Sequence, residues 1–110
     1  MSNLESANDR RDSQRQKVDL LINRFLNGHP YMCRMTDISR SGLRIVPILE
    51  PQGAPRFMGL QFQLPGASEV ITASGEAVAE NADAGGAVGV RFTSLPPASA
   101  SIIAEFLQSS

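Results

Sequence analysis

From Lys17 onward, apolar residues occur in short runs separated by turn-forming residues, which is typical of β-strands and not of long helices. The first two runs, 18–26 and 31–36, flank Asn27-Gly28, and both of these residue types tolerate the positive φ of tight hairpin turns. Alternate residues of the second run share one face, and they are Tyr31, Cys33 and Met35. The pattern predicts a hairpin over residues 18–36.

The next part of the chain contains two further strand-like runs. The segment 37–42 is predicted to be a turn, and the short strand 43–46 after it ends at Pro47, which cannot donate to a central ladder. Apolar and polar residues then alternate between residues 60 and 64. We expect a strand in each of these two runs.

Two longer runs, 70–80 and 88–92, are predicted to form a hairpin with its tip at 81–86. In the first of them, Glu76 is expected on the face opposite the apolar residues. In the second, Arg91 is expected to point outward between inward-facing neighbours. These runs bring the number of predicted strands to six.

The period changes only near the end of the chain. After Pro96-Pro97, which can begin a helix but not continue one, apolar residues recur at helical spacing, namely Ile102, Ile103, Phe106 and Leu107. Six short strands of meander type would leave exposed edges in a flat sheet, whereas closure into a barrel removes them. We therefore expect an all-β fold, a six-stranded antiparallel β-barrel plugged or flanked by a C-terminal α-helix.

The 110 residues are enough for one domain with a substantial core and too few for a second domain beside it. Residues 1–16 are polar and charged, so we expect a flexible leader at 1–16 and the barrel with its helix at 17–110. No apolar stretch approaches the roughly 18 residues of a membrane span, and the first residues lack the apolar middle of a signal peptide. A cytoplasmic protein without membrane insertion is expected.

The near-neutral total charge hides an asymmetry along the chain. Up to Arg44 there are eight basic side chains against five acidic ones, and after Arg44 there are two against six. An anionic ligand would therefore bind the first part of the chain. Because a long nucleic acid needs a broader basic surface, a compact anion fits better.

Few residues have the chemistry of catalysis or metal binding. The single cysteine, Cys33, cannot form an internal disulfide and has no Cys or His near it at metal-ligand spacing. The single histidine, His29, lies in a predicted turn, and no serine has a histidine and carboxylate arranged around it. We expect no enzyme activity, no catalytic residue and no metal site, and we place Cys33 and the methionines 32, 35 and 58 in the core.

Two polar clusters combine residue types that suit a guanine nucleotide. The first, 10–15, contains Arg10, Arg11 and Arg15, whose guanidinium forks match phosphate oxygens or the O6/N7 edge of guanine. The second, 37–42, offers the Asp37 carboxylate as an acceptor for guanine N–H groups and the Ser39 hydroxyl as donor or acceptor. Its last residue is a glycine, which lets the backbone turn or approach closely.

Together these clusters resemble the motifs of the PilZ domains that bind cyclic di-GMP. That family has Arg-x-x-x-Arg before the first strand and Asp/Asn-x-Ser-x-x-Gly at the turn after the second, and residues 11–15 and 37–42 match both without substitution. The segment Gly89-Val90-Arg91-Phe92 is also similar to the Gly-hydrophobic-Arg-Phe of the family's last strand. The resemblance covers residues 10–107 and implies the same six-stranded split barrel with a C-terminal helix.

The resemblance also implies residue roles. Arg11 and Arg15 would bind phosphate and guanine, Asp37 and Ser39 would bind a guanine edge, and Gly42 would shape the turn. Arg10 matches a position where an arginine accompanies ligand bound as an intercalated pair. These roles imply a bacterial second-messenger receptor that needs no cofactor, changes conformation on binding cyclic di-GMP and signals to a protein partner.

Three alternatives remain open at this stage. The chain could be a PilZ-type protein–protein adaptor that does not use the ligand. It could be a barrel that binds single-stranded nucleic acid, although such surfaces interleave aromatics with basic residues, and here most aromatics fall on inward faces. Finally, the arginine-rich leader could be a solvated tail, and 37–42 a turn in which Asp37 caps its own backbone.

Overall fold

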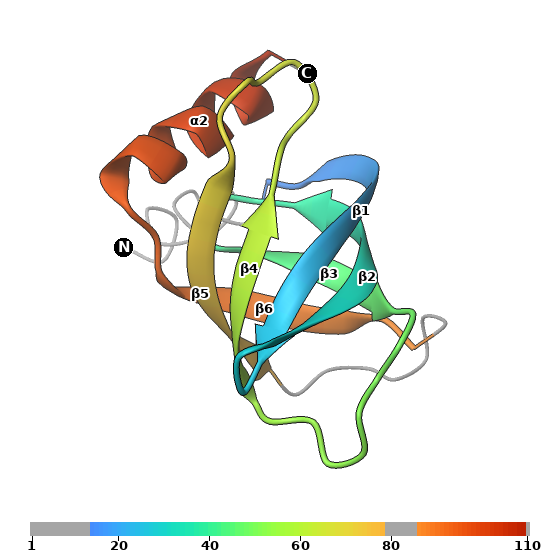
Figure 1. The fold of residues 1–110 in the computed structure, drawn as a ribbon. Helices are drawn as coiled ribbons and strands as arrows, with labels where there is room; N and C mark the ends of the chain where they lie inside the picture. Colours follow the sequence, from blue (N-terminus) through green and yellow to red (C-terminus); the bar gives the residue numbers. More distant parts are fainter. Residues whose placement is uncertain (1–13, 79–85, 110) are drawn as a thin grey trace, which may run out of the picture.

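The computed structural model of the chain describes residues 14–78 and 86–109 (Figure 1). It contains six strands followed by one helix, which confirms the predicted all-β fold with a C-terminal helix. The elements are β1 (Gln16–Leu26), β2 (His29–Ile38), β3 (Gly42–Pro47), β4 (Phe57–Phe62), β5 (Ile71–Val78), β6 (Val88–Ser94) and α2 (Pro97–Gln108).

The strands form a closed antiparallel barrel in the order β1-β2-β3-β6-β5-β4. β1, β2 and β3 form one three-stranded meander, and β4, β5 and β6 form a second. Residues 48–56 connect the two and lead the chain from β3 to β4, which pairs with β1. The closed six-stranded antiparallel barrel is confirmed, with β3 pairing with β6 and β4 pairing with β1. Leu95, after β6, and Ala100, in the first half of α2, lie beside Arg40 in the turn between β2 and β3.

The first hairpin forms for the reason that the sequence indicates. Asn27 and Gly28 both have positive φ, at 53° and 83°, as a two-residue turn with the twist of a β-hairpin requires. The strand that follows is longer than predicted and runs to Ile38, which is fully buried opposite Leu43. The predicted turn over 37–42 is therefore shorter, and Asp37 lies on a strand.

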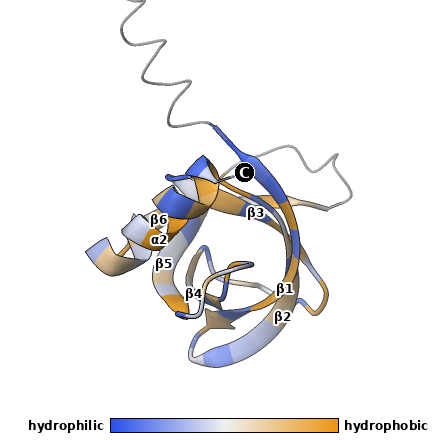
Figure 2. Ribbon diagram, turned by 90° about the horizontal axis from the view of Figure 1, so that it is seen from above, coloured by the Kyte–Doolittle hydropathy of each residue, from blue (hydrophilic) through white to orange (hydrophobic). Residues whose placement is uncertain are grey.

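Inward-facing side chains of all six strands fill the barrel, and α2 lies outside the ring of strands on the side of β5 (Figure 2). Ile103 and Leu107 are the apolar residues of the helix that become buried there. Among the methionines, Met35 and Met58 belong to the core as expected. The expectation for Met32 is wrong: it alternates with buried neighbours and is 45% exposed on the outer face.

Glu76 lies on the outer face of β5 as predicted, but it is almost completely covered. Arg56 and Arg91 both donate to its carboxylate, the second at 2.5 Å from Nη2 to Oε1. The hydrogen bond from Arg56 has the largest effect on the pKa of Glu76 and lowers it. Burial opposes this shift, and Arg91 adds a smaller lowering effect, so the pKa of Glu76 lies below its usual value. This ion-pair cluster ties β5 to β6 and to the residue before β4.

The lowered pKa of Glu76 predicts a specific pH dependence of stability. Because the folded-state value lies below the unfolded value, the contribution of Glu76 is present above pH 4.5 and is lost as the pH falls through the folded-state pKa. Glu76→Gln should therefore reduce the loss of unfolding free energy on acidification, measured by urea denaturation between about pH 3 and pH 7. Glu69→Gln, at an exposed carboxylate without an ion pair among the described residues, is the matched control. An unchanged acid profile in Glu76→Gln would contradict the prediction.

Cys33 is fully buried in the barrel, as expected. Burial raises the pKa of its thiol to about 11, and nearby Arg24 offsets this only in part. Since the thiolate is the reactive form, the folded protein should resist thiol reagents near pH 8 and react rapidly once unfolded in urea. Fast labelling of the native protein, measured with a chromogenic disulfide reagent, would disprove this burial.

Candidate functional site

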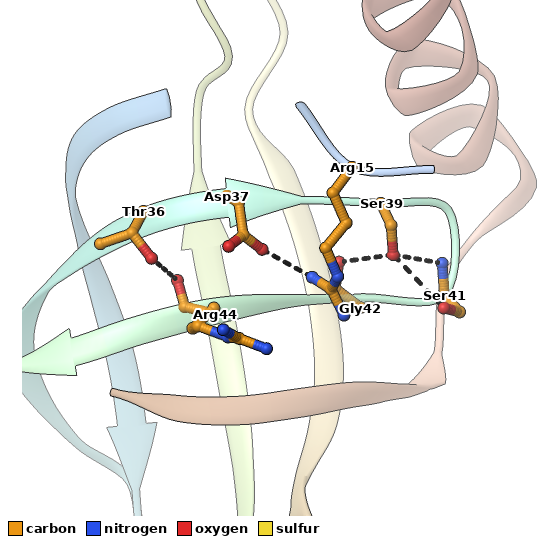
Figure 3. A network of polar contacts seen from close by, with 7 residues as sticks. All are labelled: Arg15, Thr36, Asp37, Ser39, Ser41, Gly42 and Arg44. Carbon is orange, nitrogen blue, oxygen red and sulfur yellow. Dashed lines mark hydrogen bonds and ion pairs between the residues drawn. The ribbon is translucent and has the colours of Figure 1, made fainter. Parts of the chain in front are cut away.

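Arg15, the last residue of the first polar cluster, lies beside the second cluster at one end of β1 and β2. The register places Lys17 opposite Asp37 and Gln16 opposite Ile38, so the residues just before β1 lie beside the end of β2. Arg15 Nη1 donates to Asp37 Oδ1 at 2.6 Å, and Figure 3 shows the arginine reaching back over the sheet to the carboxylate. The contact joins two motifs that are 22 residues apart in the sequence.

Both members of this ion pair remain accessible. The side chain of Arg15 is 37% exposed and that of Asp37 is 17% exposed. Exposed ion pairs contribute little to stability because water and salt screen them. The pair can therefore exchange its mutual contact for contacts with a ligand at small cost to the fold.

Arg44 lies beside the candidate site, and the motif analysis did not select it. It lies directly opposite Asp37 on β3, so both side chains belong to the same face of the hairpin (Figure 3). Arg44 is exposed and forms no ion pair within residues 14–78 and 86–109. Its position could have been predicted from the outward phase of strand 43–46 together with the pairing of β2 and β3.

Ser39 organises the short turn between β2 and β3. Its backbone N–H donates to the carbonyl of Gly42 at 2.8 Å, and its hydroxyl accepts a hydrogen bond from the N–H of Ser41 at 3.3 Å. The same hydroxyl lies 3.3 Å from the carbonyl of Gly42, and the residue is fully buried. A direct contact between Ser39 and a ligand stays a prediction and requires these bonds to rearrange.

Gly42 is needed for close packing of β3 against β6. A Cβ atom at this position would lie 2.0 Å from the carbonyl oxygen of Val90. Its φ is not positive, unlike those of four other glycines, so the requirement is space and not an unusual backbone conformation. Of the two roles that the sequence suggested for this glycine, the close approach is the one that the structure supports.

The other predicted binding residues, Arg10 and Arg11, lie outside the described residues. Within the described part of the chain, no three His, Cys, Asp or Glu side chains come together as metal ligands. In the same residues, no helix is long and apolar enough to cross a membrane. The site thus consists of Arg15 and Asp37, with Arg44 beside them, above the turn that Ser39 and Gly42 hold.

The PilZ domain family profile matches residues 9–109, almost the whole chain. The chain belongs to the PilZ domain family. No curated protein sequence matches it.

Solved structures support the same fold for this PilZ domain. The Bacillus subtilis inhibitor of motility, MotI/DgrA, is 12% identical with a TM-score of 0.70, over 86% of this chain and 48% of that protein. The Borreliella burgdorferi PlzA protein, solved in complex with c-di-GMP, is 15% identical with a TM-score of 0.63, over 96% of this chain and 44% of that protein. This PilZ domain thus spans about half the length of either protein, and at these identities the likeness shows the fold alone.

Proposed function

We propose that this PilZ domain is a cyclic di-GMP receptor that binds its ligand between the arginines of residues 10–15 and the β2–β3 hairpin. The observation that carries the proposal is the contact between Arg15 and Asp37. It joins one residue of each motif on an accessible face, in a chain whose family consists of binding and receptor proteins. PlzA, which was solved in complex with c-di-GMP, contains a similar fold over 44% of its length.

The proposed contacts follow from the chemistry of each group. Cyclic di-GMP presents anionic phosphates and guanine edges. Arg11 and Arg15 would bind phosphate oxygens or guanine O6 and N7, and Asp37 would accept from the N–H groups of the opposite guanine edge. Arg10 would support a second, intercalated ligand molecule. Arg44 adds a cationic side chain directly beside Asp37.

Binding would change the conformation of the protein by exchanging contacts. The ligand would separate the Arg15–Asp37 pair and engage both side chains, so the residues before β1 would take a new position over the hairpin. If each charge-assisted contact contributes about 1.5–3 kcal/mol, a few of them offset the ordering of these residues and leave roughly micromolar or tighter binding. The new surface would be recognised by a protein partner in the bacterial cytoplasm.

Calorimetric titration of the full chain with cyclic di-GMP tests this function, with cyclic di-AMP and GTP as controls. We expect saturable heat with cyclic di-GMP alone, and the titration also gives the ligand stoichiometry. Absence of heat at roughly millimolar ligand would exclude the receptor and favour the adaptor alternative.

A further inference from the structure

Two exposed arginines are held side by side on the outer face of the barrel. Arg56 Nη2 donates to Oε2 of Glu76, and Arg91 Nη2 donates to Oε1 of the same carboxylate at 2.5 Å. The glutamate side chain is only 7% exposed, whereas Arg56 is 69% and Arg91 is 61% exposed. Both carboxylate oxygens thus have a donor, and another molecule that approaches this face meets the two guanidinium groups. Arg56 and Arg91 are called the arginine pair below.

The arginine pair carries more positive charge and more donors than its contact with Glu76 uses. One arginine would neutralise the carboxylate, so the second leaves the cluster with an excess of positive charge. Each guanidinium has several N–H donors. The hydrogen bonds formed within residues 14–78 and 86–109 use only Nη2 of each arginine. The other donors of these exposed side chains can bind an acceptor from another molecule.

The barrel fixes the position of the arginine pair. The N–H of Ala77 donates to the carbonyl of Arg56 at 2.8 Å, which holds this residue beside β5. Arg91 lies directly opposite Glu76 in the pairing of β5 with β6. Because both guanidinium groups are already ordered on one carboxylate, an anion binds them with a smaller loss of conformational entropy than it would with two free side chains.

Exposed apolar side chains lie next to the arginine pair. The pair lines a surface hollow of about 510 Å³ together with Glu76, Ala77 and Val78, and Val78 is 36% exposed. Phe57 lies opposite Glu76 in the pairing of β4 with β5, so the two side chains share the outer face. The Phe57 side chain is 61% exposed, and its ring centroid is 5.8 Å from Cζ of Arg56. This surface therefore combines two cations with an aromatic and an aliphatic side chain.

We propose that the arginine pair, with Phe57 and Val78, binds an acidic segment of a partner protein in which a Glu or Asp lies next to an apolar residue. The carboxylate of the segment would accept hydrogen bonds from the arginine pair, and the apolar residue would contact Phe57 or Val78. Arginine and aromatic residues are enriched at protein interfaces, which favours a protein as the occupant. A long nucleic acid needs a broader basic surface than two arginines provide.

The proposed docking site lies beside the turn between β2 and β3. Gly42 is opposite Arg91 in the pairing of β3 with β6, and the N–H of Phe92 donates to the carbonyl of Ser41 at 2.9 Å. A partner bound to the arginine pair would therefore lie next to this turn. A response of the bound partner to cyclic di-GMP rests on the proposed function. The docking itself uses neither Arg15 nor Asp37 and serves a receptor and an adaptor alike.

An NMR titration of the full chain with the blocked peptide acetyl-Leu-Glu-Glu-Leu-amide tests the docking site. We expect saturable chemical-shift changes at Arg56, Phe57, Val78 and Arg91, with a dissociation constant on the order of 1 mM. Raising the salt from about 0.05 M to about 0.5 M should weaken binding, because the cations are exposed. Arg56→Gln and Arg91→Gln should each raise the dissociation constant by about threefold or more, and each variant leaves Glu76 one arginine partner.

The controls separate charge, position and ligand class. The peptide acetyl-Leu-Gln-Gln-Leu-amide should not bind saturably, because it has no carboxylate for the arginine pair. Arg34→Gln changes an exposed, ion-paired arginine on β2 and should leave the affinity for the glutamate peptide unchanged. Sodium phosphate should bind more weakly than this peptide, because it makes no apolar contact. Circular dichroism establishes that each variant is folded.

Several results would overturn the docking proposal. They are the absence of saturable changes with about 20 mM glutamate peptide, equal binding of the glutamine peptide, and unchanged affinity in both variants of the arginine pair. Phosphate binding as tight as that of the glutamate peptide would also overturn it and would assign the arginine pair to phosphate groups. All titrations are performed without cyclic di-GMP, so their outcome is independent of the receptor proposal.

Discussion

Arg15→Ala is expected to abolish calorimetrically detectable binding of cyclic di-GMP and to leave the thermal unfolding of the barrel almost unchanged. Arg15 lies before β1 and contacts Asp37 from outside the sheet. Loss of each of its charge-assisted contacts with ligand should cost about 1.5–3 kcal/mol, more than tenfold in affinity per contact. The folded state loses only an exposed ion pair, worth about 0–1 kcal/mol.

Arg34→Ala is the matched control for this experiment. Arg34 is also an exposed arginine in an ion pair, with Asp19, but it lies on the outer face of β2 away from the hairpin turn. Its removal should leave ligand affinity unchanged. Arg11→Ala should reproduce the loss seen in Arg15→Ala, and wild-type affinity in both of these variants would refute the proposed binding mode.

Gly42→Ala is expected to destabilise the fold by about 3 kcal/mol or more, which corresponds to a fall of roughly 15 °C in melting temperature. The added Cβ would lie 2.0 Å from the Val90 carbonyl oxygen, and only a backbone shift between β3 and β6 could relieve that overlap. Urea denaturation of the purified variant, or its failure to accumulate as folded protein, measures the effect.

Gly59→Ala separates this steric requirement from a general effect of alanine in a strand. Gly59 lies on β4, and its added Cβ would make an ordinary contact of 3.5 Å with the Cβ of Phe25. We expect a change below about 1 kcal/mol there. Similar stability of Gly42→Ala and wild type would show that β3 and β6 are not packed as closely as described.

Local periodicity predicted most of the fold, because strand alternation and turn chemistry are properties of neighbouring residues. The hairpin at Asn27-Gly28 and the helix after Pro96-Pro97 are examples. The strand order could not be predicted in the same way, since it depends on how the 48–56 connection crosses the barrel. Contacts between distant segments determine the strand order, and the alternation of apolar and polar residues does not encode these contacts.

The ion-pair partners of buried charged residues could not be predicted from local periodicity either. Glu76 has the outward phase that the sequence predicts, yet two arginines from other parts of the chain cover it. Arg24 points inward from β1 and is 3% exposed. Its Nη2 donates to Glu50 Oε1 at 2.8 Å, and its Nε has no hydrogen-bond partner among the described residues. In both cases the phase was predictable, but the partners come from distant segments.

The candidate site was predictable in its motifs and only partly in its geometry. The motif spacing identified Arg15, Asp37 and Gly42, and the structure brings the first two into contact. The role of Ser39 in holding the turn and the position of Arg44 opposite Asp37 depend on where β2 ends and how β3 pairs with it. β2 extends to Ile38 because this side chain is fully buried, whereas the sequence pattern predicted that Ile38 lies in the turn.

The most direct test of the receptor proposal is a backbone NMR titration of the full chain with cyclic di-GMP. We predict saturable chemical-shift changes concentrated in residues 14–17 and 36–44, with little change in the turn over 65–69 on the far side of α2. Absence of saturable changes, or changes centred on another face of the barrel, would contradict the proposal that ligand binds between the leader arginines and the β2–β3 hairpin.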